Sequence, residues 1–148
     1  MVKVKKNKKF MSKNQNGKEN GYVIPIVDVK DDFPEEDRFP HQVYLTVVAP
    51  GEIKGPHHHK IRYAMYTCIK GNIKIVVKNS DSYEIYYSGE DHDYATVWVE
   101  KGYPTALINL EKERESMIIN TPNPSFRECP NDEHEVDFDP RYLTREIR

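Results

Sequence analysis

The sequence predicts an all-β protein, a single domain that folds as an antiparallel sandwich or barrel. Three observations support this prediction. No stretch shows clear helical periodicity, short stretches are rich in β-branched and aromatic residues, and Gly, Pro, Asn and Asp interrupt these stretches at regular intervals. The length of 148 residues is that of one ordinary domain and allows a buried core.

Eight strands are expected, with turn residues between them. The predicted ranges are Gly21–Val29, Gln42–Val48, Lys60–Ile69, Asn72–Lys78, Ser82–Tyr87, Ala95–Val99, Thr105–Leu110 and Ser116–Asn120. Breaks such as Lys70-Gly71-Asn72 and Asn79-Ser80-Asp81 have the composition of turns. About eight strands at such regular spacing are typical of antiparallel sandwiches and barrels.

Both ends of the chain differ in composition from the predicted barrel. Residues 1–20 carry a cluster of lysines, and we expect a solvated N-terminal arm there, preceding a domain over residues 21–148. Residues 121–148 are polar and punctuated by proline, so we expect them to form an extended C-terminal tail of that domain. Three aromatic residues are expected to pin the tail across the domain: Phe126, Phe138 and Tyr142.

Composition argues against several classes of partner. A formal net charge of −2 argues against nucleic acid. No apolar run is long enough to cross a membrane, and the N-terminus lacks the apolar segment of a signal peptide, so we expect a cytoplasmic protein with no membrane partner. Cys68 and Cys129 have neither metal-type nor redox spacing, which argues against a disulfide scaffold.

Three consecutive histidines in the segment GPHHHKIR lie in a specific frame. Five residues separate Gly51 from His57, one separates His57 from His59, four precede Ala64 and six more precede Gly71. This spacing resembles the first signature of the cupin superfamily, G-x5-H-x-H-x4-E-x6-G, with Ala64 in place of the glutamate.

A later segment, EKGYPTALIN, resembles the second cupin signature, P-x-G-x2-H-x3-N. Gly102 and Asn109 are kept, whereas Glu100 replaces the proline and Thr105 replaces the histidine. Together the two signatures imply a single cupin jelly-roll barrel, which agrees with the antiparallel strands expected on either side.

The two departures argue against a metal site. In a metal-binding cupin, the resemblance implies four ligands, and Ala64 and Thr105 remove two of them. Two imidazoles alone make a weak site, since transition metals normally take three or four protein ligands. Because side chains alternate along a strand, His58 is expected to face away from His57 and His59. We therefore expect no metal and no other cofactor.

The histidine segment also resembles two groups of metal-poor cupin isomerases. PGEIKGPHHHK is similar to the R-G-x-H segment of epimerases related to dTDP-4-dehydrorhamnose 3,5-epimerase, with Lys54 in the arginine's place. It is also similar to the R-G-x-H-A-H segment of dTDP-sugar 3,4-ketoisomerases. The resemblance covers roughly residues 39–140 and implies a metal-independent isomerase for a nucleotide-linked, dTDP-type 4-keto-6-deoxy sugar, either a single-centre epimerase or a ketoisomerase. It implies a role in cell-surface polysaccharide synthesis.

Both reactions remove a proton next to a keto group and return a proton elsewhere through an enolate. The base needs a pKa near neutrality, which an imidazole provides, so we assign this role to His57, with His59 as a second catalytic histidine. The resemblance implies a carboxylate partner for the base, and Asp139 in the late segment FDP is the match. The segment TPNPSFRE lacks the epimerases' tyrosine proton donor. Tyr44, Tyr66 and Tyr103 are possible substitutes, and we place Tyr66 among the catalytic residues.

Further residues are expected to bind the substrate. The enolate oxygen and the diphosphate are negatively charged and need cations as partners. The resemblance places Ala64 at the position of the epimerases' strand lysine, so other residues have to supply this charge. The candidate substrate-binding residues are Lys54, Arg62, Lys70, Tyr44, Tyr103 and Thr105.

Two alternatives stay open. The missing lysine and tyrosine also fit a non-catalytic cupin that binds a sugar or nucleotide sugar, and a metal-dependent cupin enzyme is the third candidate. The resemblance further implies a homodimer formed by exchanging or adding an N-terminal strand, for which Gly21–Val29 is the candidate.

Overall fold

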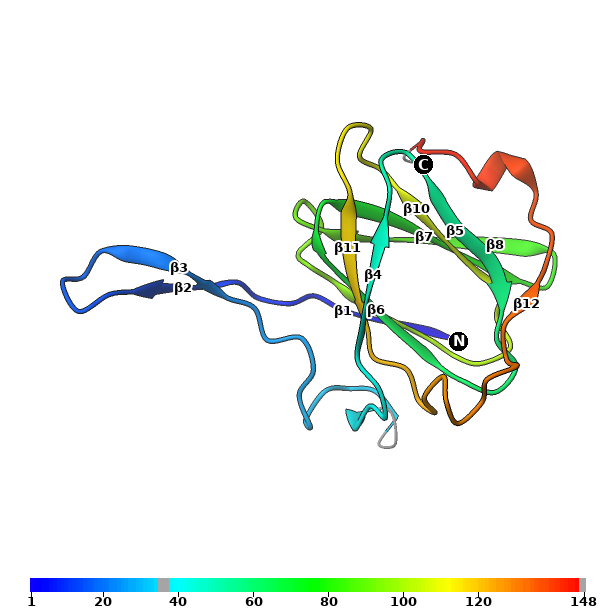
Figure 1. Ribbon diagram of the computed structural model, residues 1–148, viewed down its shortest axis with the longest axis horizontal. Coiled ribbons are helices and arrows are strands. Elements are labelled where there is room, and N and C mark those ends of the chain that lie inside the picture. The colour runs from blue at the N-terminus through cyan, green and yellow to red at the C-terminus, as the bar shows by residue number, and fades with distance from the viewer. Residues whose placement is uncertain (35–37, 147–148) are drawn as a thin grey trace.

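The computed structural model describes residues 1–34 and 38–146, and it confirms the predicted all-β fold as a jelly-roll barrel of two antiparallel sheets (Figure 1). The first sheet has the order β1-β9-β6-β11-β4, with the bounds Val2–Lys5, Thr96–Val99, Ala64–Lys70, Ser116–Asn120 and Tyr44–Val48. The second has the order β12-β5-β10-β7-β8, with the bounds His134–Glu135, Ile53–His58, Thr105–Asn109, Asn72–Asn79 and Ser82–Gly89. Residues 147–148 of the predicted tail lie outside the described residues.

The strand predictions are most accurate in the middle of the chain. From β7 to β11, and also for β4, each predicted strand lies within two residues of its expected ends. The range Lys60–Ile69 is wrong at its start, since β6 begins at Ala64. Asp132 accepts hydrogen bonds from the backbone amides of residues 60–62, so these amides are not available to a neighbouring strand.

The strand that carries His57 and His58, β5, is missing from the predicted strands, and it contains Gly55 and Pro56, which are residues typical of breaks. The strand continues through them with an irregularity, so that His57 pairs with Thr105 but Lys54 pairs with Leu107. Gly55 has a φ of +86°, and a Cβ there would lie 2.9 Å from the carbonyl oxygen of Thr105. Glycine is therefore required at this close approach of β5 to β10.

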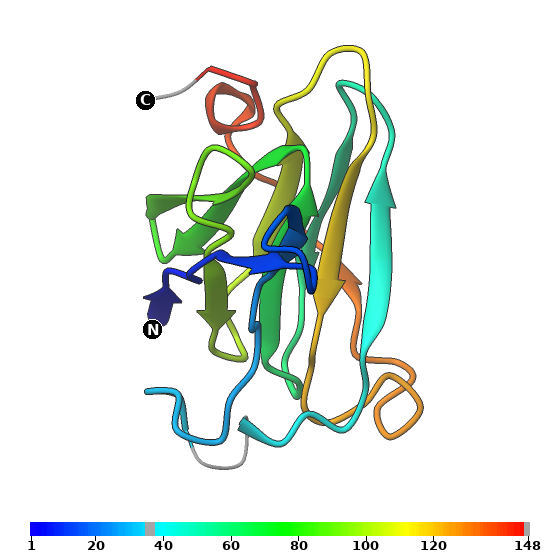
Figure 2. The same cartoon turned by 90° about the vertical axis from the view of Figure 1, so that its left-hand side faces the viewer.

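The lysine-rich N-terminal segment takes part in two sheets. β1 pairs with β9 along the edge of the first sheet. β2 (Phe10–Lys13) pairs with β3 (Glu19–Val23) in a hairpin that projects from the barrel (Figures 1 and 2). The strand predicted over Gly21–Val29 is therefore shifted, since β3 ends at Val23. The hairpin includes residues on both sides of residue 20, where the boundary between arm and domain was expected. That boundary stays a prediction.

The core lies between the two sheets, where strands place alternate side chains on opposite faces. Ile73, Ile75 and Val77 of β7 point inward and are fully buried. Cys68 of β6 lies in the same core, and burial raises the pKa of its thiol to about 12. Cys68 therefore acts as a small packing residue rather than a nucleophile.

The C-terminal tail crosses the outer face of the second sheet. Phe138 packs edge-on against Tyr83 with the ring centroids 5.3 Å apart, and Tyr142 stacks on the same ring at 4.1 Å. These two aromatics pin the tail as predicted. The prediction for Phe126 is wrong, since its side chain is 47% exposed.

Lys74 holds the end of the tail. It lies on β7 between the core residues Ile73 and Ile75, so its side chain points to the outer face, where it is fully buried. Its Nζ donates to the backbone carbonyls of Thr144 and Glu146, at 2.9 and 3.0 Å. These bonds supply partners that a buried ammonium needs.

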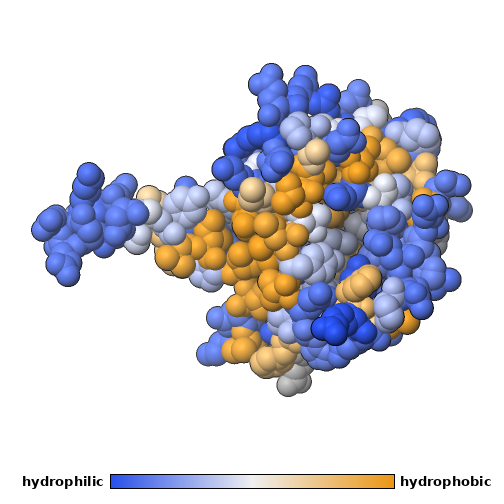
Figure 3. Space-filling view, viewed as in Figure 1, coloured by the Kyte–Doolittle hydropathy of each residue, from blue (hydrophilic) through white to orange (hydrophobic). Residues whose placement is uncertain are grey.

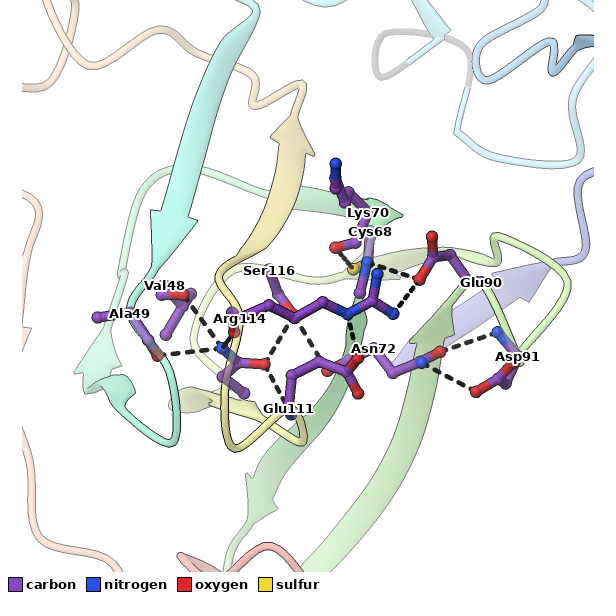
Figure 4. A network of polar contacts seen from close by, with 12 residues as sticks. Val48, Ala49, Cys68, Lys70, Asn72, Glu90, Asp91, Glu111, Arg114 and Ser116 are labelled. Atoms are coloured by element: carbon purple, nitrogen blue, oxygen red, sulfur yellow. Dashed lines mark hydrogen bonds and ion pairs between the residues drawn. The ribbon is translucent and has the colours of Figure 1, made fainter. Parts of the chain in front are cut away.

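One end of the barrel is closed by a network of polar contacts (Figure 4). Nδ2 of Asn109 donates to the carbonyls of Val48, Ala49 and Arg114 at 3.0–3.1 Å. Its Oδ1 accepts from the amide of Glu111 and the hydroxyl of Ser116. The side chain thus joins the loop after β4 to the loop between β10 and β11, which explains why an asparagine stands at this position.

We expect Asn109→Ala to lower the free energy of unfolding by about 3 kcal/mol, because buried carbonyls and the Ser116 hydroxyl lose their partner. Chemical denaturation monitored by fluorescence measures this loss. The control Asn79→Ala, at an exposed position, is expected to change stability by less than about 0.5 kcal/mol. Equal stability of the two variants would contradict this role of Asn109.

Candidate active site

A cavity of about 160 Å³ lies between the two sheets, at the end of the barrel away from the Asn109 network. The same strands serve both ends: β6 places Tyr66 at the cavity and Lys70 beside the network (Figure 4). The residues that line the cavity are Tyr44, Thr46, Lys54, His57, His59, Arg62, Tyr66, Thr105, Leu107, Asn120 and Glu133.

Most of the predicted site residues meet at this cavity. Seven of the ten candidates line it: His57, His59, Tyr66, Lys54, Arg62, Tyr44 and Thr105. His58 instead lines a separate pocket on the outside of the barrel. The alternation expected for the three consecutive histidines is therefore present in the structure, and three candidates, Asp139, Lys70 and Tyr103, lie elsewhere.

Asp139 does not lie beside His57. Its carboxylate caps the 3₁₀ helix Pro140–Tyr142 by accepting a hydrogen bond from the amide of Arg141, and it pairs with the guanidinium of Arg141 at 2.6 Å. The Arg141 guanidinium holds the pKa of Asp139 below its usual value. The carboxylate expected from the segment FDP thus stabilises the tail instead of the base.

The other two displaced candidates are also explained by their place in the fold. Lys70 ends β6 at the closed end of the barrel, where its carbonyl accepts a contact from the thiol of Cys68. Tyr103 lines the outer pocket together with His58, and its carbonyl accepts a hydrogen bond from Thr105. Neither side chain lines the cavity.

Glu133 supplies a carboxylate for His57. Oε1 of Glu133 lies 2.9 Å from Nδ1 of His57, at ion-pair distance, and the two side chains are 48% and 36% exposed. A carboxylate at Nδ1 favours the proton on that nitrogen and leaves Nε2 as the basic one. The arrangement is that of an oriented base at the mouth of the cavity.

His59 forms its hydrogen bond with Arg62, and the Glu133 carboxylate lies farther away, 3.9 Å from its Nε2. Nη2 of Arg62 lies 3.0 Å from its Nε2. Because a guanidinium can only donate, Nε2 of His59 accepts this bond and the ring carries its proton on Nδ1. Burial, together with the positive charge of Arg62, lowers the pKa of His59 from 6.5 to about 4. His59 is therefore a neutral acceptor that orients Arg62, and a weak base.

Two tyrosines line the cavity in unlike surroundings. The hydroxyl oxygen of Tyr44 accepts a 2.6 Å hydrogen bond from Nδ2 of Asn120. Burial raises the pKa of Tyr44, and the nearby charge of Arg62 opposes this rise. Burial raises the pKa of Tyr66 more strongly, since its side chain belongs to the core between the sheets. Both phenols therefore stay protonated at neutral pH and can donate a proton or a hydrogen bond.

Sequence reasoning missed three residues at or next to the cavity: Glu133, Asn120 and Asp132. Glu133 and Asp132 belong to the segment NDEHE, whose last two residues form β12 and pair with His58 and His57. A short acidic segment before a two-residue strand has no distinctive periodicity. The available signal was the pair of acidic residues in an otherwise polar tail, and it did not identify a partner.

Two positions of the cupin ligand set carry no metal-binding side chain in this chain. Thr105 and the core residue Ala64 occupy the positions where the cupin signatures would have ligands. Within residues 1–34 and 38–146, no group of three or more His, Cys, Asp or Glu side chains is arranged to hold a metal ion. No helix in this part of the chain is long and apolar enough to span a membrane.

Comparison with known proteins gives a family and a fold. The family model "FdtA: WxcM-like, C-terminal" matches residues 7–128. No curated protein matches the chain. Among solved structures, a dTDP sugar isomerase from Desulfovibrio desulfuricans G20 superposes with a TM-score of 0.76 at 11% identity, covering 96% of this chain and 87% of the other.

Two further structures have the same fold. The sugar 3,4-ketoisomerase QdtA from Thermoanaerobacterium thermosaccharolyticum, solved in complex with TDP, gives a TM-score of 0.66 at 17% identity, with 96% and 91% of the two chains covered. A dTDP-4-dehydrorhamnose 3,5-epimerase from Sulfolobus tokodaii gives 0.73 at 17% identity, with 99% and 82% covered. The predicted cupin-like fold is confirmed by these similarities.

The lowered pKa of His59 predicts a specific pH dependence of stability. Unfolded chains protonate an imidazole below about pH 6.5, whereas the folded protein keeps His59 neutral down to about pH 4. The unfolded state thus binds more protons in this window, and the free energy of unfolding falls as the pH falls through it, by about 3 kcal/mol from His59.

Chemical denaturation at pH 7 and pH 4 measures this effect. We expect His59→Gln, whose amide oxygen can accept from Arg62, to show a smaller loss of stability between the two pH values than the wild type. His134→Gln, at an exposed position, is the control and is expected to keep the wild-type pH dependence. A His59→Gln variant with the same pH dependence as the wild type would show that His59 is not held neutral.

Proposed function

The chain belongs to the family FdtA: WxcM-like, C-terminal, and from this premise we propose that it is an isomerase of a nucleotide-linked 4-keto-6-deoxy sugar. The observation that carries the proposal is the pairing of His57 with Glu133 at the mouth of the cavity. An imidazole oriented by a carboxylate is suited to proton transfer at neutral pH. The dTDP-linked substrates of the similar structures support the same class of ligand, with dTDP as the proposed nucleotide.

In the proposed reaction, Nε2 of His57 removes a proton from the carbon next to the keto group. The electron pair of the C–H bond moves to the keto oxygen and gives an enolate, and the imidazolium is stabilised by Glu133. Return of a proton to the same carbon from the other face gives epimerisation. Ketoisomerisation instead requires proton transfer between the two oxygens and to the former carbonyl carbon.

The guanidinium of Arg62 is the proposed stabiliser of the enolate oxygen. It lines the cavity and is oriented by its bond to His59, which the low pKa of His59 keeps in the accepting state. A fixed positive charge aimed at a developing oxyanion lowers the barrier without further reorganisation. His59 thus acts through Arg62, and we no longer assign it the role of second base.

Tyr44 is the preferred proton donor of the two cavity tyrosines. Its hydroxyl already lies in a polar network with Asn120, whereas Tyr66 is packed in the core. A hydroxyl that exchanges protons has to reach both substrate and a polar network, which favours Tyr44. Tyr66 then serves as a wall of the cavity.

The size of the cavity indicates which part of the substrate enters. About 160 Å³ is smaller than the roughly 300–1,000 Å³ of pockets that enclose whole drug-sized ligands. We infer that the sugar ring enters between the sheets while the nucleotide lies outside, with Lys54 at the cavity near the diphosphate. Action without a metal, location in the cytoplasm and use in polysaccharide synthesis remain predictions.

We also propose a homodimer. The hairpin β2–β3 exposes four large side chains to about half of their area: Phe10, Met11, Tyr22 and Val23. The outer face of β4 exposes Leu45 and Val47. Figure 3 shows a hydrophobic area that continues from the base of the hairpin over this side of the barrel. A second copy, with its hairpin on the face of β4, would cover both surfaces at once.

Deuterium incorporation tests the reaction. With dTDP-4-keto-6-deoxyglucose in deuterated water, we expect the wild type to incorporate deuterium at C3 or C5 if it epimerises, or at C4 of the product if it ketoisomerises, detected by NMR. His57→Asn is expected to lower the rate by about 10²–10⁴-fold, as for loss of a general base. His58→Asn, a matched change on the outward side of β5, should leave the rate unchanged. Binding of the substrate without exchange in the wild type would favour the non-catalytic sugar-binding alternative.

Light scattering during gel filtration tests the dimer. We expect the wild type to elute at twice the monomer mass and Leu45→Lys to shift the equilibrium towards monomer, since a charge would be buried in the interface. Phe126→Lys alters an aromatic residue of similar exposure in the turn before Cys129 and should leave the mass unchanged. A wild type that elutes as a monomer would contradict the proposal.

A further inference from the structure

Asp132 is a buried carboxylate next to the candidate active site, and it receives several backbone hydrogen bonds. Its Oδ1 accepts from the amides of Lys60 and Ile61, at 2.9 and 3.0 Å. Its Oδ2 accepts from the amides of Ile61 and Arg62, at 3.0 and 2.9 Å. Only 3% of the residue is exposed. Three successive amides thus converge on one side chain.

The amides keep this carboxylate ionised. Burial by itself would raise the pKa of Asp132, but the hydrogen bonds from Arg62, Ile61 and Lys60 outweigh burial and lower it. Within residues 1–34 and 38–146, no Lys, Arg or His nitrogen lies at ion-pair distance from Asp132. The backbone of the turn is therefore what stabilises the buried charge.

The turn that Asp132 holds carries two cavity side chains. It begins after His59 and ends at Arg62, and the side chains of these two residues bond to each other across it. Because the amide of Arg62 is fixed by Oδ2, the start of its side chain is fixed as well. The direction of the guanidinium then depends on this anchor, on Nε2 of His59 and on the hydroxyl of Tyr44, with which Arg62 also forms a hydrogen bond.

Asp132 also directly precedes Glu133, the residue that pairs with the proposed base His57. Glu133 follows it directly and lies 2.9 Å from His57, and β12 begins at the next residue and pairs with β5. With Asp132 anchored on one side and β12 on the other, the backbone of Glu133 has little freedom. The carboxylate of Asp132 therefore fixes the position of Glu133, which pairs with His57, and also that of Arg62.

We propose that Asp132 is a positioning residue that holds Arg62 against His59 and Glu133 against His57. The kinetic part of this inference rests on the proposed function, whereas the structural part does not. Asp132→Asn is the informative variant, because the amide keeps the shape of the side chain but turns one acceptor into a donor that faces backbone donors. A turn anchored in this way should loosen.

The first test is NMR of the full chain with ¹⁵N-labelled histidine, which distinguishes protonated from unprotonated ring nitrogens. In the wild type at neutral pH, we expect His59 to be fixed with the proton on Nδ1 and Nε2 as acceptor. In Asp132→Asn, we expect the averaged pattern of two exchanging tautomers for His59. Asp31→Asn is the matched control, since Asp31 is a nearly buried carboxylate that accepts a backbone amide on another part of the molecule.

The second test is the deuterium exchange described above. We expect Asp132→Asn to lower the exchange rate by about 10²-fold, as misplacement of catalytic groups by about 1 Å does, and Asp31→Asn to leave it unchanged at a temperature where all variants are folded. An Asp132→Asn variant with wild-type histidine spectra and a wild-type rate, but lower stability, would overturn the proposal. Such a result would leave Asp132 a merely structural residue.

Two further outcomes are covered by the same design. If Asp132→Asn does not fold, Asp132→Glu is measured instead, because it keeps the charge but moves the carboxylate by one methylene, and the same changes in the His59 spectrum and in the exchange rate are expected. If the wild type shows no exchange at all, the proposed function fails, whereas the His59 spectra still decide whether Asp132 positions Arg62.

Discussion

Each strand of this barrel has to satisfy two environments, because alternate side chains point to opposite faces of a sheet. On β7, Ile73 and Ile75 fill the space between the sheets, while Lys74 between them points outward and needs cover. The tail provides that cover on the second sheet, and Phe33 packs over Met65 and Trp98 on the first. The space between the two sheets then borders on solvent only at the two ends of the barrel. The polar network of Asn109 closes one end, and the cavity opens at the other.

At the open end of the barrel, the imidazoles of His57 and His59 lie two residues apart in the chain but have different electrostatic surroundings. His57 lies partly exposed with its Nδ1 2.9 Å from Glu133, whereas His59 is mostly buried, with its Nε2 3.0 Å from Arg62 and 3.9 Å from the same carboxylate. The two rings therefore take different roles despite their identical chemistry, because burial and the guanidinium keep His59 neutral while Glu133 orients the ring of His57. This division gives the cavity one group suited to accept a proton and one suited to hold a cation in place.

Much of the fold could be predicted from the sequence because its signals are local. Alternation and turn residues locate β7 to β11, and the spacing of His57, His59 and Gly71 locates the cavity. The signals failed where distant segments decide the structure. β5 contains a Gly-Pro break that pairing with β10 overrides, and the acidic residue beside His57 comes from a tail with no periodicity of its own. Asp139 matched a family segment, yet its neighbour Arg141 holds it in the tail.

The contact between Asp132 and the turn 60–62 has a consequence for how such a site can diverge. Its carboxylate binds amides, which every residue except proline possesses, so it places no demand on the side chains of Lys60 and Ile61. Both side chains are exposed next to the mouth of the cavity. Any residue except proline at positions 60 and 61 can therefore keep these hydrogen bonds. Substitutions there would change the surface beside the cavity while the positions of Arg62 and Glu133 stay the same.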